Sequence, residues 1–92
     1  ASLNKRKRVC IISPEYDRIR RYIVDDLYRG CSLYSQKGGF TGRENVEIQA
    51  ILSQGEFASL MEFIRDNYIK AFITAGNCSE VYGLWRGGKQ DR

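Results

Sequence analysis

The 92-residue sequence contains no histidine, and this absence removes most of the common catalytic and metal-binding arrangements. Its three cysteines, Cys10, Cys31 and Cys78, are an odd number and show no CxxC spacing. A zinc set, a Cys–His pair and a Ser–His pair are therefore all missing. We expect three reduced cysteines in a cytosolic domain. We also expect no catalytic residue, no metal site and no cofactor, and hence a protein that is not an enzyme.

The sequence also lacks long apolar runs. No segment approaches the roughly 20 apolar residues that a helix needs to cross a bilayer, and the polar, basic start is not a signal peptide. The hydrophobic fraction of 42% and the charged fraction of 28% are those of a globular protein. A chain of this length forms one small domain with a modest core. Because its first residue is alanine, we expect it to be cut from a longer protein.

Positive charge is concentrated at the two ends of the chain. Residues 5–8 read Lys-Arg-Lys-Arg, and Arg86, Lys89 and Arg92 lie in a Gly-rich tail. Without these seven cations and Asp91, the body carries eight cations and ten anions, which does not indicate a nucleic-acid-binding surface. The basic run is either a solvated terminus or a segment beside a membrane span, on its cytoplasmic side. We therefore divide the chain into three parts: a basic linker over 1–8, a soluble domain over 9–83 and a flexible C-terminal tail over 84–92.

The first half of the domain predicts a strand, a helix and a second strand. Residues 9–12 form a short apolar run that is typical of a central strand. Ser13 is a good N-cap, Pro14 suits the first helical turn, and Gly30 is a usual helix stop. The helix expected over 14–28 has one apolar stripe, formed by Tyr16, Ile19, Ile23 and Leu27. The second strand is expected over 31–36.

The second half predicts a strand, a helix and a last strand. Strict alternation over 46–53 predicts a half-buried strand, with Ile51 as the one apolar residue on its polar face. Ser53 and Glu56 have the spacing of a capping box, and a helix is expected to follow through residue 68. Residues 71–75 predict the last strand, Gly76-Asn77 a turn, and residues 79–82 an additional edge piece.

The resulting order, β-α-β-β-α-β, predicts a ferredoxin-like α+β sandwich. Its four-stranded antiparallel sheet would carry both helices on one face. The other face would be open, with Cys10 or Ile12 and Ile51 supplying apolar contacts. Because a small domain usually covers such a face with a partner, we expect a homo-oligomer.

The stretch over residues 29–43, RGCSLYSQKGGFTGR, holds four of the nine glycines and three cations. It is not a Walker loop, since the GxxxxGK[ST] spacing is missing. Two interpretations remain open. In the first, the glycines satisfy a hairpin turn and the first arginine caps a helix end. In the second, glycine amides, cations, hydroxyls and an aromatic ring hold a small anionic ligand such as a nucleotide. The candidate ligand-binding residues are Arg29, Ser32, Lys37, Gly38, Gly39, Phe40, Thr41, Gly42 and Arg43.

Four short motifs occur in order along the chain, namely Arg29-Gly30-Cys31-Ser32, Gly38-Gly39-Phe40-Thr41-Gly42, Ala71-Phe72-Ile73 and Glu80-Val81-Tyr82-Gly83. They resemble the C-terminal soluble domain of YitT-type bacterial membrane proteins, and the resemblance runs over about residues 9–83, which is most of the chain. That family pattern reads roughly Arg-Gly-Val-Thr, Gly-x-Tyr-Thr, Ala-Phe-Ile/Val and Glu-Val-x-Gly. The sequence departs from it at Tyr68-Ile69, where relatives often have Asp-Pro, and at Leu84-Trp85-Arg86, where they commonly have glycine and phenylalanine.

The resemblance implies a cytoplasmic domain of unknown function that follows several transmembrane helices, with residues 1–8 as the linker to the last span. The family is also similar in topology to PII-type signalling proteins, trimers that bind nucleotides beside a mobile loop. It therefore implies a regulatory, ligand-sensing domain on the cytoplasmic face of the plasma membrane. The alternative is a purely structural module that oligomerises the parent membrane protein through the open sheet face. Binding of nucleic acid is not expected.

Overall fold

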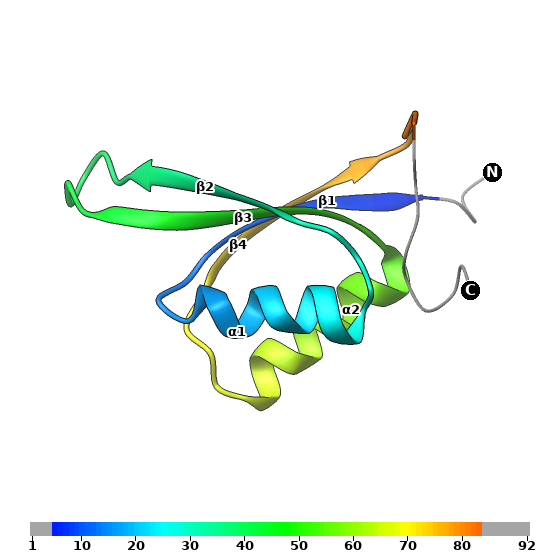
Figure 1. Ribbon diagram of the computed structural model, residues 1–92, viewed down its shortest axis with the longest axis horizontal. Coiled ribbons are helices and arrows are strands. Elements are labelled where there is room, and N and C mark those ends of the chain that lie inside the picture. The colour runs from blue at the N-terminus through cyan, green and yellow to red at the C-terminus, as the bar shows by residue number, and fades with distance from the viewer. Residues whose placement is uncertain (1–4, 84–92) are drawn as a thin grey trace.

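The structure is a computed structural model that describes residues 5–83, and its elements follow the predicted β-α-β-β-α-β order (Figure 1). A short π-helical segment, η2, continues the first helix. The elements in chain order are β1 (Arg6–Ile12), α1 (Tyr16–Arg21), η2 (Tyr22–Asp26), β2 (Ser32–Lys37), β3 (Glu44–Ser53), α2 (Gln54–Asp66) and β4 (Phe72–Cys78).

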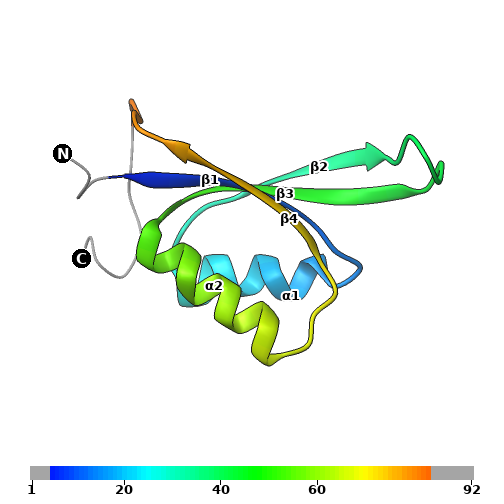
Figure 2. The ribbon, with the colours of Figure 1, turned by 180° about the vertical axis from the view of Figure 1, so that it is seen from behind.

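The four strands form one antiparallel sheet in the order β2-β3-β1-β4, and both helices lie on the same side of it (Figures 1 and 2). This confirms the predicted ferredoxin-like sandwich. Alternate residues of the two central strands enter the core, as the period of a strand requires. The largest fully buried side chains within residues 5–83 are Val9, Ile11, Ile19, Ile23, Ile48, Leu52 and Leu60.

Both terminal strands are longer than the sequence predicts. β1 begins at Arg6, so three cations of the expected linker pair within the sheet. β4 continues through Gly76 and Asn77, where a turn was expected, because these residues pair with Arg8 and Lys7 of β1. The extra edge piece expected over 79–82 is not a strand. The expected tail over 84–92 lies outside the described residues.

The first helix begins and ends differently from the prediction. Ser13 is not its N-cap, because α1 starts two residues after Pro14. Glu15 occupies the N-cap position, and its side chain makes no capping hydrogen bond. Ser13 instead accepts a hydrogen bond from the amide of Glu15 (3.0 Å) and donates one to the carbonyl of Lys70 (2.6 Å). Gly30 is not the helix stop either. The chain leaves the helix at Tyr28, whose φ of 59° is left-handed.

The second helix confirms the predicted capping box. The Ser53 side chain accepts from the amide of Glu56 (3.1 Å), and Glu56 accepts from the amide of Ser53 (2.8 Å). At its other end the amide of Tyr68 donates to the Arg65 carbonyl and that of Ile69 to the Ile64 carbonyl. This is a Schellman motif, in which glycine usually takes the left-handed position. Here Tyr68 takes it, with a φ of 53°.

Candidate functional site

The glycine-rich hairpin is closed by its own backbone. The amide of Gly38 donates to the carbonyl of Arg43 (2.8 Å), and the amide of Gly42 donates to the carbonyl of Gly38 (2.9 Å). Thr41 Oγ1 accepts from the amide of Arg43 (3.1 Å). Gly42 has a φ of 73°, and a Cβ on Gly38 would lie 2.9 Å from Thr41 Oγ1. Turn geometry therefore accounts for these two glycines without any ligand.

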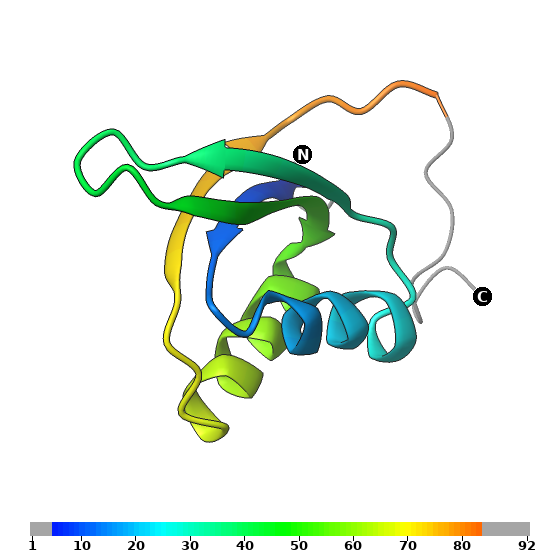
Figure 3. The same cartoon turned by 60° about the vertical axis from the view of Figure 1, so that its left-hand side comes forward.

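The hairpin projects beyond the helices, and its tip is exposed (Figure 3). The Phe40 ring is fully exposed, and the side chains of Lys37 and Arg43 are exposed as well. The tip thus presents one aromatic ring and two cations to solvent. Lys37, Phe40 and Arg43 are not among the residues that line either of two hollows on the described part of the chain.

Arg29 does not belong to the same site as the hairpin tip. It lies before β2, while the tip follows β2, and six strand residues separate the two by about 20 Å. Its side chain is 3% exposed, and its Nε lies 3.0 Å from both carboxylate oxygens of Glu56. Ser32 is exposed at the same distant end of β2. The structure therefore separates Arg29 and Ser32 from the other predicted site residues, Lys37 to Arg43.

A hollow of about 350 Å³ lies between the base of the hairpin and the β1–α1 turn. Glu44 and Asn45 of β3 lie on one side of it, and Tyr16 of α1 contributes an aromatic ring. Glu44 is the only charged residue in its lining, so the hollow suits donor groups better than an anion. The sequence did not single out this hollow, because it joins residues that are about 30 positions apart. Its lining residues are Ser13, Pro14, Tyr16, Ser35, Glu44, Asn45 and Val46.

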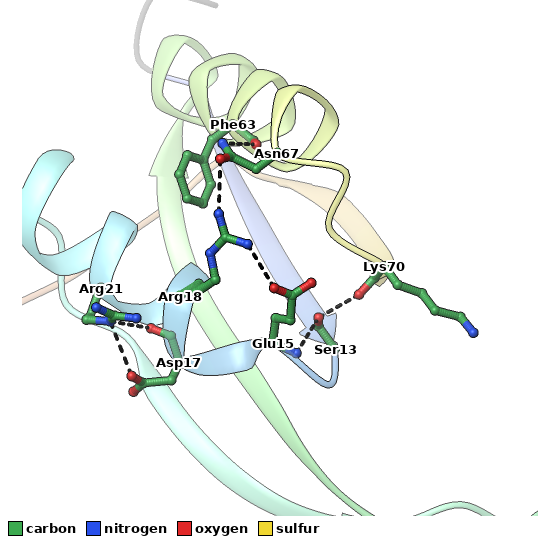
Figure 4. Close-up of polar contacts among 8 residues, drawn as sticks. All are labelled: Ser13, Glu15, Asp17, Arg18, Arg21, Phe63, Asn67 and Lys70. Carbon is green, nitrogen blue, oxygen red and sulfur yellow. Dashed lines mark hydrogen bonds and ion pairs between the residues drawn. The ribbon is translucent and has the colours of Figure 1, made fainter.

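Polar contacts tie the two helices together near their exposed ends (Figure 4). Arg18 donates to Glu15 Oε1 (2.8 Å) and to Asn67 Oδ1 (3.0 Å), and so links the start of α1 to the end of α2. The pKa of the Asp17 carboxyl is lowered, chiefly by a hydrogen bond from Arg20. Burial raises the pKa of the Cys31 thiol, which disfavours the reactive thiolate. The contacts of Arg18 with Glu15 and Asn67 therefore hold the two helices together.

The sheet face opposite the helices is not covered by any element among residues 5–83 (Figures 1 and 2). The strand register places an apolar and aromatic row across it: Tyr34 opposite Glu47, Glu47 opposite Ile12, and Ile12 opposite Phe72. Tyr34 is 49% exposed and Phe72 66% exposed. We call this surface the open face.

Opposite charges occupy two corners of the open face. Glu47 pairs in register with Ile12, and Arg8 pairs with Ile51, with the Cys10–Gln49 pair midway between them. Glu47 and Arg8 are therefore diagonal corners of a rectangle centred on that pair. A two-fold axis through this centre, lying in the plane of the face and perpendicular to the line between the two corners, exchanges them. The Arg8 and Glu47 corners of the open face are thus complementary in charge between two copies.

The glutamate corner is held in place by neighbouring amides. Gln49 donates to Glu47 Oε2 (2.9 Å) and Gln36 donates to Glu47 Oε1 (3.4 Å). Arg8 is exposed and makes no ion pair within residues 5–83. The sequence predicted that Ile51 and either Cys10 or Ile12 contribute to this face, and the strand register places all three there. It did not predict that Tyr34 and Phe72 lie on this face. Their positions in the alternation of their strands could have placed them there, once a strand register was assumed.

Comparisons with known proteins agree with this fold. A family described as "Uncharacterized protein conserved in bacteria (DUF2179)" matches residues 29–83. An uncharacterized protein in the cccA 5' region of Bacillus sp. (strain PS3) is 31% identical over 77 residues, which cover 84% of this chain and 51% of the relative. The UPF0750 membrane protein YxkD of Bacillus subtilis is 27% identical over 81 residues, which cover 88% of this chain and 29% of the relative. The chain thus spans about half or less of these relatives.

Among solved structures, a PII-like signalling protein from Thermus thermophilus matches with a TM-score of 0.64 at 16% identity, covering 82% of this chain and 87% of that one. Neither helix within residues 5–83 is long and apolar enough to pass through a bilayer. The resemblance to the soluble domain of YitT-type membrane proteins, and to PII-type topology, is confirmed. The chain belongs to the DUF2179 family of bacterial proteins, and its named relatives include membrane proteins.

Proposed function

We propose that this domain is a non-enzymatic assembly module, held at the cytoplasmic face of the plasma membrane by a larger parent protein, and that it self-associates through the open face. The observation that carries the proposal is the row of Tyr34, Ile12 and Phe72, of which Tyr34 and Phe72 are exposed and Ile12 is half-buried, on a sheet face that no element within residues 5–83 covers. Exposed apolar surface of this kind marks interaction sites in soluble domains. The membrane relatives supply the context in which a small domain would bring parent chains together.

A second copy is the occupant that fits best, because the face complements itself. Closed two-fold pairs use the same patch on both partners, so each contact occurs twice. Here the axis through the Cys10–Gln49 pair brings Arg8 of each copy towards Glu47 of the other. A face of one sign would repel its own copy instead. When two sheets pack face to face, alternate side chains of both inner faces become buried. Tyr34, Ile12 and Phe72 are side chains of the open face that such packing would bury.

Sedimentation of the Phe72→Glu variant tests this proposal. Phe72 lies on the open face, whereas Phe40 is a fully exposed phenylalanine at the hairpin tip. We expect the parent chain to self-associate with rising concentration, and Phe72→Glu to lower that association at least about tenfold, because a charge would be buried unpaired. Phe40→Glu should associate like the parent. A parent chain that stays strictly monomeric, or two variants that behave alike, would contradict the proposal.

Ligand sensing is a second candidate, and the hollow beside the hairpin favours it. The hollow is within the size range of small-molecule sites and contains an aromatic ring with several polar groups. The similarity to a PII-like signalling protein also supports a signalling role. Because Glu44 is its charged group, a bound molecule would be neutral or cationic at that point, unlike the anion first expected. A nucleotide could reach Lys37 and Arg43 only with its phosphates outside the hollow.

Thermal shift measurements separate these ligand classes. Mono- and dinucleotides test the anionic version, and polyamines and amino acids test the version that Glu44 favours. A true ligand should raise the melting temperature of the parent chain and leave that of Glu44→Gln less affected. If no compound at millimolar concentration shifts the parent chain, the ligand-sensing candidate fails and the assembly module stands on its own test.

A further inference from the structure

The outer edge of β2 is a row of backbone groups without a neighbouring strand among residues 5–83. In the sheet order β2-β3-β1-β4, β2 comes first, so its one partner within this part of the chain is β3. Such an edge presents amides and carbonyls with which another extended chain can pair. Proteins often protect an edge strand with charged residues or proline, whereas β2 reads SLYSQK and has neither before its last residue.

Alternate residues of β2 direct these backbone groups outward. The amide of Gly38 donates to the carbonyl of Arg43, so these two residues form a hydrogen-bonded pair at the end of the ladder. Because bonded and non-bonded pairs alternate along antiparallel strands, the amides and carbonyls of Leu33, Ser35 and Lys37 face away from β3. None of the three makes a backbone hydrogen bond to a turn or loop within residues 5–83. We call this row the β2 edge.

The side chains along the β2 edge lie on the helix side of the sheet. Leu33 pairs in register with the buried Ile48, and Ser35 pairs with Val46. Leu33 is 47% exposed, so apolar surface lies open beside the edge. Ser35 and Glu44 both line the hollow of about 350 Å³ at the base of the hairpin. The β2 edge therefore runs directly into this hollow.

The hollow lies at the end of the sheet away from the start of β1 and the end of β4. Ser35 pairs with Val46, whereas Arg6 at the start of β1 pairs with Ser53, seven positions and about 23 Å further along β3. β4 ends at Cys78, which also pairs with Arg6. Figures 1 and 2 show the hairpin and the start of β1 at opposite ends of the domain.

We propose that the β2 edge binds an extended segment of a partner protein as an additional antiparallel strand, with a lysine or arginine side chain of that segment in the hollow. Strand addition of this kind is a common mode of peptide recognition. It deepens the ligand-sensing candidate, on whose hollow it rests, and is independent of the open face. Antiparallel addition continues the pairing found between all neighbouring strands of the sheet.

The chemistry of the segment follows from the side chains beside the edge. A residue opposite Ser35 has its side chain on the same face as Ser35, so that side chain lies over the hollow. There Glu44, which makes no ion pair within residues 5–83, can accept hydrogen bonds from its cationic end. Two positions later the segment passes Leu33, where an apolar side chain suits the exposed leucine. The segment thus has the order basic, any residue, apolar.

Calorimetric titration of the 92-residue chain with designed peptides tests the proposal. The probe is an acetylated, amidated peptide of threonines with Lys-Thr-Leu at its centre, so that its lysine lies opposite Ser35 and its leucine opposite Leu33. One control peptide has glutamate in place of the lysine. Another is N-methylated at the lysine amide, which removes the donor to the Ser35 carbonyl. We expect the parent chain to bind the lysine peptide at least about tenfold more tightly than the glutamate peptide, and at least about fivefold more tightly than the N-methylated one.

Matched variants of the domain test the same two contacts. Glu44→Gln should lose the preference for lysine over glutamate, whereas Glu62→Gln, at an exposed position of α2, should keep it. Ser35→Pro removes an outward amide and leaves the ladder between β2 and β3 intact, since an edge strand tolerates proline where its nitrogen faces outward. It should weaken binding of the lysine peptide at least about fivefold. If Ser35→Pro does not fold, the N-methylated peptide still tests this edge.

Three results would overturn the proposal: no binding of the lysine peptide to the parent chain, a preference for lysine that survives in Glu44→Gln, or equal binding of the N-methylated peptide. In the last case the hollow alone holds the lysine, as in the ligand-sensing candidate. If no peptide binds and Ser35→Pro lowers self-association in sedimentation, a second copy occupies the edge instead. Phe72→Glu should bind the lysine peptide like the parent chain, so failure at the open face and failure at the β2 edge are distinguished.

Discussion

At the scale of single residues, Glu56 has the most consequential position in the chain. Its carboxylate completes the capping box of α2 by accepting from the Ser53 amide, and it also meets the buried Arg29 side chain. The residue that sequence reasoning assigned to an anionic ligand is thus committed to an internal carboxylate. Local spacing was enough to predict the cap, because both partners lie within one turn. The ion pair spans 27 positions and depends on the fold, so no local pattern could predict it.

Removal of Glu56 should therefore destabilise the domain far more than loss of a helix cap. Glu56→Ala leaves a buried guanidinium without this carboxylate, and we expect a loss of about 3–5 kcal/mol in the free energy of unfolding. Glu62→Ala, an exposed glutamate on the same helix, should change it by less than about 0.5 kcal/mol. Urea denaturation of the two variants measures both values. Similar values for the two would mean that Arg29 and Glu56 form no significant pair.

At the scale of elements, both helices leave their last turn through a tyrosine in the left-handed region, Tyr28 and Tyr68. Sequence rules place glycine there, and they chose Gly30 for the first helix. They failed because the residue after each of these tyrosines is buried, Arg29 in the first case and Ile69 in the second, and this packing fixes where each helix must end. Pairing likewise overrode local signals in β4, where Gly76 and Asn77 join the sheet beside β1. The alternation in β3 was predictable because Ile48, Ala50 and Leu52 on one face are buried.

The left-handed tyrosine at the end of α2 gives a stability prediction. Tyr68 is 93% exposed, so its ring contributes little packing, while its backbone conformation is unfavourable for any residue with a Cβ. Tyr68→Gly should raise the free energy of unfolding by about 0.5–1 kcal/mol, with Schellman hydrogen bonds intact. Tyr68→Ala keeps the Cβ and should bring no such gain. Thermal denaturation that ranks alanine at or above glycine would show that the strain is absent.

At the scale of the whole molecule, the two faces of the sheet differ in composition. One face is apolar and packs on the helices. The other contains the apolar and aromatic row together with two opposite charges. The general layout was predictable, because the order of elements allows few topologies. The composition of the open face was only partly predictable. Tyr34 and Phe72 belong to edge strands whose register with β3 and β1 exists only in the folded sheet.

A charge-swap experiment tests the central claim most directly, by sedimentation equilibrium of three variants. Arg8→Glu and Glu47→Arg should each weaken self-association at least about tenfold, because each places like charges together across the two-fold axis. The double variant Arg8→Glu/Glu47→Arg restores opposite charges between copies and should regain most of the association. Within one chain the two residues are four strand positions apart, about 13 Å, so rescue cannot arise inside a single domain. A double variant no better than either single variant would contradict assembly through the open face.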